Sequence, residues 1–175
     1  GPPVVEFTLY GTSGSQERFG YAVAQSRDRL TISTPTNMRL AVTTFPTSTS
    51  SAHACVRVYN LNTFHVAPVQ MGAEIPAISN STTEPLSVSM TRNPDRVAIG
   101  ARHHNNNSGN VRVYQFSAGV WTLIFDVSGT VTGEKFGKSV ALNGGDGTRL
   151  LVGGGPSSTK VSFFDIDAGG GTGPV

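Results

Sequence analysis

The stretch FGKSVALNGGDGTRLLVGG, residues 136–154, contains two short apolar runs on either side of an Asp-Gly pair. Asp146-Gly147 can supply the positive φ that a tight β-hairpin needs. Residues such as Leu150 and Val152 alternate with others, as one packed face of a strand requires. The stretch therefore predicts two antiparallel strands. Related stretches occur twice earlier in the chain, so this hairpin is the last copy of a repeated unit.

Three landmarks recur in the same order along the chain. The first is a valine between small residues, the second is an arginine followed by apolar residues, and the third is an apolar or aromatic pair. In order they are Val23, Val88 and Val140; Arg29-Leu30, Arg96-Val97 and Arg149-Leu150; and Val58-Tyr59, Val113-Tyr114 and Phe163-Phe164. The third landmark recurs after 55 residues (58 to 113) and again after 50 (113 to 163). Periods of this length are typical of propeller blades, solenoids or arrays.

A further apolar segment precedes each copy, so each unit has four short strands. The three segments are VVEFTLY (4–10), HVAPVQM (65–71) and VWTLIFDV (120–127). The pattern predicts an all-β chain with about twelve strands and almost no helix.

The units are expected over about 4–64, 65–119 and 120–167, in one β-domain that covers 1–167. The Ser/Thr-rich segment 35–54 and the segment 101–110 are expected loops. The Gly-rich residues 168–175 are an expected flexible tail.

Phe19-Gly20 and Phe136-Gly137 each begin a copy, and the strands RVAIGA (96–101) and RLLVGGGP (149–156) close two of them. These motifs resemble the FG-GAP repeat family, whose best-known member is the β-propeller of integrin α-subunits. Bacterial and algal extracellular variants are the most similar. The second copy departs from the family, since Glu84-Pro85 replaces Phe-Gly. The resemblance implies three four-stranded antiparallel propeller-type blades.

Integrin-type blades bind calcium through an acidic loop between their first two strands. The corresponding loop here, 143–147, contains one carboxylate, Asp146. Calcium takes roughly six to eight oxygen ligands, several of them charged. Asp165 and Asp167 together also provide fewer oxygens than a full set of calcium ligands. We therefore expect a hairpin turn and no metal or cofactor, with calcium at these three aspartates as the alternative.

Three blades form an incomplete propeller, because closure typically takes about four to eight. The last unit lacks an outer strand, whereas the segment 4–10 is a spare one. Three interpretations are open: a fragment of a longer propeller, a strand that seals its own chain, or a strand exchanged with a neighbouring subunit. We favour exchange with a neighbouring subunit. Such a head-to-tail contact builds a filament when it does not close into a ring. The apolar residues of this assembly strand are Val4, Val5, Phe7 and Leu9.

The composition favours an extracellular or cell-surface protein. Charged residues make up 14% of the chain and the net charge is +2, which excludes a nucleic-acid-binding footprint. Ser, Thr and Gly take the place of charged residues. The one cysteine, Cys55, excludes an intrachain disulfide. No apolar run approaches the roughly 20 residues of a membrane-spanning helix.

Two Asn-x-Ser/Thr patterns and one Ser/Thr-rich stretch predict covalent glycans, with unmodified loops as the alternative. Asn80 and Asn106 are the candidate N-glycosylation sites. The candidate O-glycosylation sites lie around Pro46 and are Thr43, Thr44, Thr47, Ser48, Thr49, Ser50 and Ser51. Glycans at these positions would form a hydrated coat on a surface that has few charges.

Eleven acidic residues leave a glycoside-hydrolase pair open, but no pair among them stands out, so we predict a structural or adhesive protein and not an enzyme. Residues 11–15 (GTSGS) break the G-x-S-x-G pattern at its last position. His103 and His104 would point to opposite sides of an extended chain, which argues against a shared metal. The alternative function is that of an adhesion propeller whose loops bind protein or glycan ligands, with calcium.

Overall fold

The computed structural model describes residues 8–11, 17–26, 38–46, 54–61, 67–76, 86–91, 95–143, 145–156, 158 and 160–167. These residues form an all-β structure of twelve strands and one short helix, α1 (His104–Asn107). None of the described helical residues forms a segment long and apolar enough to cross a membrane. The prediction of an all-β chain is confirmed.

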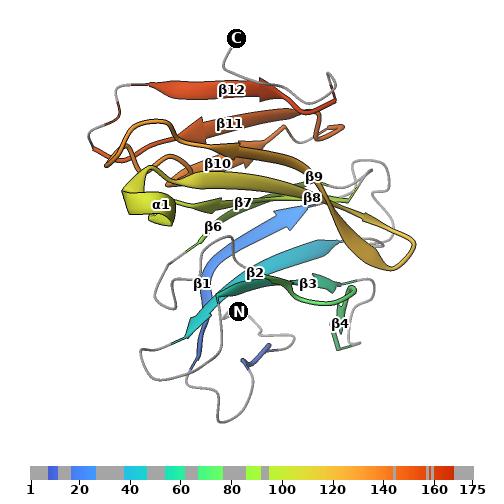
Figure 1. Cartoon of the computed structure of the whole chain (residues 1–175). Helices are drawn as coiled ribbons and strands as arrows, with labels where there is room; N and C mark the ends of the chain where they lie inside the picture. The colour runs from blue at the N-terminus through green and yellow to red at the C-terminus, as the bar shows by residue number, and fades with distance from the viewer. Residues whose placement is uncertain are drawn as a thin grey trace, which may run out of the picture.

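The strands form three antiparallel sheets that follow one another along the chain (Figure 1). The first contains β1 (Glu17–Ser26), β2 (Arg39–Pro46), β3 (Cys55–Asn60), β4 (Val69–Gln70) and β5 (Ile75–Pro76). The second contains β6 (Ser87–Thr91), β7 (Arg96–Ala101), β8 (Asn110–Ser117) and β9 (Val120–Ser128). The third contains β10 (Ser139–Leu142), β11 (Arg149–Gly153) and β12 (Val161–Asp165). Neighbouring strands in sequence are neighbours in each sheet, except that β5 pairs with β3 and not with β4.

The second sheet lies between the other two, and both of its faces are buried (Figure 1). Side chains on a strand alternate between the two faces of the sheet. In β7, Val97 and Ile99 therefore join the core shared with the first sheet, whereas Ala98 joins the core shared with the third. We call these the first core and the second core. The apolar run of β7 is explained by this double burial.

The middle strand of the first sheet differs from the sequence prediction. Arg29-Leu30 lies outside the described residues, and β2 lies within 35–54, which was predicted to be a loop. Ser26 at the end of β1 pairs with Arg39, which places Arg39-Leu40 at the position of the second landmark. The loop prediction is wrong for 39–46, because residues 41–45 are buried as a strand of the first sheet.

The sheets divide the chain at places other than the predicted unit boundaries. β4 and β9 pair with β3 and β8, so each completes the sheet that precedes it in sequence. The sheets therefore span 17–76, 87–128 and 139–165. Of the predicted outer strand 4–10, residues 8–10 are described and are not in a strand, and Val4, Val5 and Phe7 lie outside the described residues. The tail 168–175 also lies outside them.

Gly109 allows the second sheet to approach the segment that leads into β10. Its φ is +86°, its N–H donates to the oxygen of His104, and it forms a β-bridge with Phe136. A Cβ at this position would overlap the backbone of Phe136. Gly119, in the turn between β8 and β9, has a similar φ of +85°, but a Cβ there would meet nothing within 4 Å.

We expect Gly109→Ala to destabilise the fold more than its matched control, Gly119→Ala. Both alanines must adopt a left-handed backbone conformation, at a cost of order 1 kcal/mol. Only Gly109→Ala also overlaps a neighbouring backbone, which adds about 1–3 kcal/mol. Urea unfolding of the two variants measures the difference. Equal losses in the free energy of unfolding would contradict this packing.

Candidate functional site

An arginine begins the middle strand of each sheet at the same position in the strand pairing. The cross-strand pairs are Arg39–Asn60, Arg96–Gln115 and Arg149–Asp165. In the first two, the guanidinium also donates to the partner's side-chain oxygen, at 2.6 Å and 3.0 Å respectively. The repeat therefore places a cation at the same corner of every sheet.

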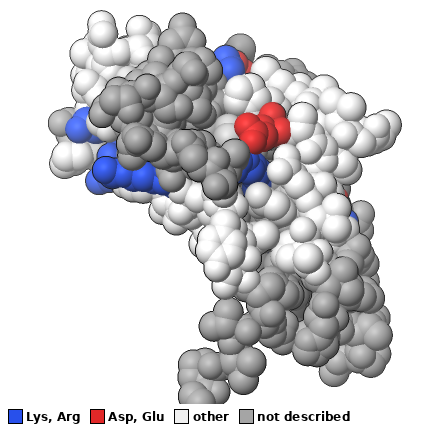
Figure 2. Space-filling view, turned by 90° about the horizontal axis from the view of Figure 1, so that it is seen from below, with Lys and Arg blue, Asp and Glu red and all other residues white. Residues whose placement is uncertain are grey.

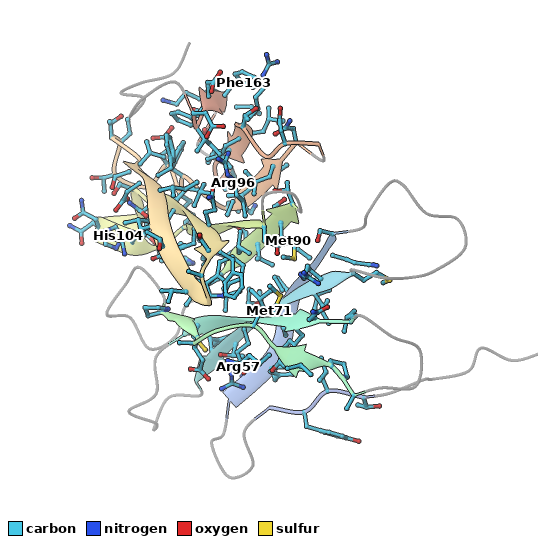
Figure 3. All side chains as sticks on the ribbon, turned by 90° about the vertical axis from the view of Figure 1, so that its right-hand side faces the viewer. Arg57, Met71, Met90, Arg96, His104 and Phe163 are labelled. Atoms are coloured by element: carbon cyan, nitrogen blue, oxygen red, sulfur yellow. The ribbon has the colours of Figure 1, made fainter. Side chains whose placement is uncertain are left out.

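The first two arginines reach into the turn that precedes the middle strand of the next sheet. Arg39 Nε lies 3.4 Å from Asp95 Oδ2. Arg96 Nη1 donates to the carbonyl oxygen of Gly147 at 3.0 Å, and its Nη2 lies 2.8 Å from Asp167 Oδ1. Arg96 lies between the second and third sheets in Figure 3. These contacts fix the stacking of successive sheets through one recurring side chain.

Two residues after each arginine, an apolar cross-strand pair lies on the face that points to the next sheet. The pairs are Ala41–Val58, Ala98–Val113 and Leu151–Phe163. The first pair is buried in the first core and the second pair in the second core. The third pair is 43% and 37% exposed, and Phe163 lies at the far end of the stack (Figure 3). No described sheet covers it.

Arg149 also lies on this exposed face. Its Cζ lies 5.7 Å from the ring centroid of Phe163, a cation–π distance. Val161, which pairs with Gly153, is 67% exposed on the same face. We call the face that carries Arg149, Leu151, Val161 and Phe163 the tail face.

The corresponding face at the opposite end of the stack is largely covered, since Val42, Cys55 and Tyr59 on it are 2%, 5% and 8% exposed. The three valines of the first landmark are equivalent, since Val23, Val88 and Val140 pair with Val42, Ile99 and Val152. Val88 packs against the first core and Val140 against the second core. Val23 is 62% exposed. We call the face of the first sheet that carries Val23 and Val42 the head face.

The third sheet has an open edge as well as an open face. β8 pairs with β9 on its far side, and β3 pairs with β4 and β5. Among the described residues, no strand pairs with the far side of β12. An unpaired strand edge offers backbone donors and acceptors to an incoming strand. The described part of the third sheet therefore has three strands, one fewer than the predicted unit.

The turn between β10 and β11 is held by the side chain of Asp146. Its Oδ1 accepts hydrogen bonds from Asn143 Nδ2 at 2.6 Å, Thr148 N at 3.1 Å and Thr148 Oγ1 at 2.9 Å. These bonds, that from Asn143 first, lower the pKa of Asp146 to about 2. The carboxylate stabilises the turn in its ionised form.

The three aspartates considered as calcium ligands line one open pocket of about 590 Å³, together with Asn143, Thr148 and Arg149. Each already has a contact: Asp167 binds Arg96, and Asp165 accepts a hydrogen bond from the N–H of Asp167. Among the described residues, no three His, Cys, Asp or Glu side chains are placed to hold a metal ion. The pocket's carboxylates therefore act in the turn and in the contact between sheets.

The predicted glycosylation sites differ in accessibility. Asn106 is exposed in α1, whereas Asn80, Thr47 and residues 48–51 lie outside the described residues. Thr43 and Thr44 are buried in β2. Thr43 Oγ1 accepts a hydrogen bond from the N–H of Ala22, and Thr44 Oγ1 is bonded to Cys55 Sγ. The prediction that Thr43 and Thr44 carry glycans is wrong for the folded chain, because both hydroxyls are enclosed and already bonded.

Cys55 and His103 both have structural contacts. Burial raises the pKa of Cys55 to about 11, which keeps the thiol protonated and unreactive. His103 is hydrogen-bonded to Asn107 and to Arg102. Seen from below, the described surface is mostly uncharged, with a few separate basic and acidic groups (Figure 2).

No family model matches the chain, and no curated protein matches it significantly. The candidate site therefore depends on geometry alone. The sequence pattern located the edge of the third sheet, but it did not reveal the tail face. The signal for that face is that Leu151 and Phe163 repeat the buried pairs of the first two sheets with larger side chains.

We expect Arg96→Met to destabilise the chain strongly and Arg149→Met, at the equivalent position, to change its stability little. The buried guanidinium of Arg96 satisfies Gly147 and Asp167, and loss of such charged hydrogen bonds costs about 2–3 kcal/mol. Arg149 is exposed, and surface substitutions stay within about 0.5 kcal/mol. Urea unfolding at low protein concentration measures both. Similar losses for the two variants would contradict the role assigned to Arg96.

The low pKa of Asp146 predicts part of the acid sensitivity of the fold. Its pKa is about 2 in the folded chain against an ordinary value of 3.8. A group with a lowered folded pKa contributes stability that is present above about pH 4 and is lost as the pH falls towards 2. The midpoint of urea unfolding should therefore fall less between pH 4 and pH 2 in Asp146→Asn. Asp165→Asn, which removes the same charge from β12, is the control. A wild-type pH profile in Asp146→Asn would contradict this role.

Proposed function

We propose that the chain is an extracellular structural or adhesive subunit of FG-GAP type that assembles into a filament. In this proposal its three sheets are propeller-type blades, and the N-terminal segment 4–10 of one subunit pairs with the open edge of β12 in the next. The open edge is the observation that carries the proposal. It is the position that β4 and β9 occupy in the first and second sheets.

The order of the strands along the chain supports this exchange. β4 completes the first sheet shortly before the chain enters β6, and β9 completes the second sheet before β10. The segment 4–10 precedes β1 in the same way, so its equivalent place is the edge of a sheet that precedes the first one. In a row of subunits, that sheet is the third sheet of the neighbour.

The segment has the sequence of an edge strand that is buried on one face. Val5, Phe7 and Leu9 alternate with other residues and would point to the same side of the strand. Added strands gain affinity from backbone hydrogen bonds and specificity from alternate side chains. A contact between two different surfaces that does not close into a ring extends without limit.

The surface is also compatible with an extracellular setting. The described end of the molecule in Figure 2 has few charges, and Asn106 itself is exposed in α1, whereas Ser108 of its sequon is buried. A glycan at Asn106 would lie on α1, away from the edge of β12 (Figure 1). Glycosylation there is thus part of the proposal and leaves the assembly edge accessible.

Deletion of residues 1–10 is expected to abolish filaments and leave a folded monomer, because the donated strand is removed. Electron microscopy and sedimentation velocity of both proteins provide the measurement. A synthetic peptide of residues 1–11 should bind the shortened chain, and a peptide with Phe7→Asp and Leu9→Asp is its matched control. Filaments of the shortened chain that equal those of the full chain would refute strand donation.

A further inference from the structure

A second pocket lies between the end of β9 and β12, where the second and third sheets meet. Its volume is about 180 Å³. The end of β9, the segment that leads into β10 and the strand β12 contribute, among others, Val127, Ser128, Glu134, Phe136, Ser162 and Phe164. Sites for drug-sized ligands span roughly 300–1,000 Å³. This pocket therefore suits a ligand of about one six-membered ring.

The pocket contains a buried carboxylate that is only half paired. The side chain of Glu134 is 6% exposed, and its Oε1 lies 3.1 Å from Nζ of Lys160. Its Oε2 is buried and has no hydrogen-bond partner among the described residues. A carboxylate oxygen accepts hydrogen bonds and does not donate them, and leaving it unpaired in a protein interior is costly. Since Glu134 lines the pocket, a ligand there would supply an O–H or N–H donor.

The charges of the pocket favour a neutral ligand. Glu134 and Lys160 are the two charged groups among the described residues that line it, and they form one ion pair. A ligand ammonium would be repelled by Lys160, and a ligand carboxylate would be repelled by Glu134. A hydroxyl group donates to a carboxylate without adding a charge. The ion pair therefore selects hydroxyl donors over ionic ones.

The rest of the lining has both apolar and hydroxyl groups. Phe136 and Phe164 belong to the second core, with ring centroids 6.1 Å apart and an interplanar angle of 87°. They give the pocket an apolar wall. The hydroxyl groups of the lining are those of Ser128, Thr130 and Ser162. A sugar ring matches this combination, because it presents C–H groups and several hydroxyls within one small molecule.

The backbone holds the carboxylate in place before any ligand binds. The N–H of Glu134 donates to the oxygen of Val131 at 3.1 Å, and its carbonyl accepts from the N–H of Gly155 at 2.7 Å. The N–H of Phe136 donates to the oxygen of Ser108 at 3.0 Å. A preorganised site reduces the ordering cost of binding. These bonds tie the segment between β9 and β10 to both neighbouring sheets.

We propose that this pocket binds one neutral sugar ring, with a ring hydroxyl donating to Oε2 of Glu134. The ring is either a free monosaccharide or the terminal residue of a glycan. Hydrogen bonds to a charged acceptor are the stronger kind, so this contact would contribute much of the affinity. The proposal goes beyond self-assembly, because it uses neither the segment 4–10 nor the open edge of β12.

Saturation-transfer difference NMR with D-glucose, D-galactose and D-mannose tests the pocket in the full-length chain. The method observes the signals of the sugar, so it applies to single chains and to filaments. At least one hexose should bind saturably with a Kd of about 1 mM, as expected for so small a ligand. D-Glucosamine in its ammonium form and D-glucuronate should bind at least about fivefold more weakly, because each adds a like charge. A charged ring that binds more tightly than every neutral one would overturn the proposal.

Two substitutions locate the binding in the pocket. Glu134→Gln should raise the Kd of the hexose at least about tenfold, because the charged acceptor is lost. Glu74→Gln, at a glutamate that is ion-paired with Arg57 outside the pocket, is its matched control. Lys160→Met removes the ammonium, so D-glucosamine should bind it more tightly than it binds the wild type. Lys160 is 55% exposed, so this variant should fold normally. Lys138→Met, at an exposed position outside the pocket, is the second control.

Two results would overturn the proposal. If no hexose binds saturably, the pocket holds water only. If Glu134→Gln and Lys160→Met both bind as the wild type does, the sugar binds elsewhere. The methyl glycoside of the best hexose distinguishes the two sources: equal binding supports a terminal glycan residue, and lost binding supports a free monosaccharide. Sugar binding that persists in a chain that does not assemble would refute the filament and leave this pocket standing.

Discussion

The stacking of the second and third sheets depends on the hydrogen bond and the ion pair that the guanidinium of Arg96 forms across them. The guanidinium leaves the corner of β7 and satisfies the carbonyl of Gly147 and the carboxylate of Asp167 in the next sheet. A buried cation requires such partners, since an unpaired one would be expelled from a core of apolar side chains. The contact therefore fixes the rotation of one sheet on the next, which apolar packing alone specifies poorly. Arg39 has the corresponding role one sheet earlier, with Asp95 as its partner.

This repetition explains why the ends of the stack are the sites of interest. The second sheet contributes side chains to both cores, and its strand β7 is buried on both sides. The third sheet has the same kind of sequence on its tail face, including Leu151 and Phe163, but lies at the end of the stack. Function is thus suggested by an incomplete repetition, because β12 lacks the edge partner that β3 and β8 have among the described strands, and the donated strand that we propose would supply it.

The sequence predicted a large part of this structure because the landmarks are local. The alternation around Val88 and Val140 and the turn at Asp146-Gly147 specify strands and hairpins with residues close in the chain. The middle strand of the first sheet was misplaced because Arg-Leu occurs twice, at 29–30 and at 39–40. Only the long-range pairing of Val42 with Val23 and Arg57 distinguishes the two.

The candidate site was predicted less well, for a related reason. Alternation indicates that a strand has an apolar face, but it does not indicate which neighbour covers that face. Leu151 therefore has the same pattern as Ala98, although one is exposed and the other buried. Thr43 and Thr44 show the reverse case. Their Ser/Thr-rich stretch predicts exposed hydroxyls, but both side chains are buried. Their bonds to Ala22 and Cys55 allow them to be buried in β2.

Hydrogen exchange at the open edge of β12 tests strand donation most directly. We expect the backbone N–H groups of β12 to exchange more slowly in the assembled full-length chain than in the chain that lacks residues 1–10, because the donated strand would bond to this edge. Mass spectrometry measures the exchange, with the edge strand β4 as the internal reference. Equal exchange rates of β12 in the two proteins would contradict strand donation.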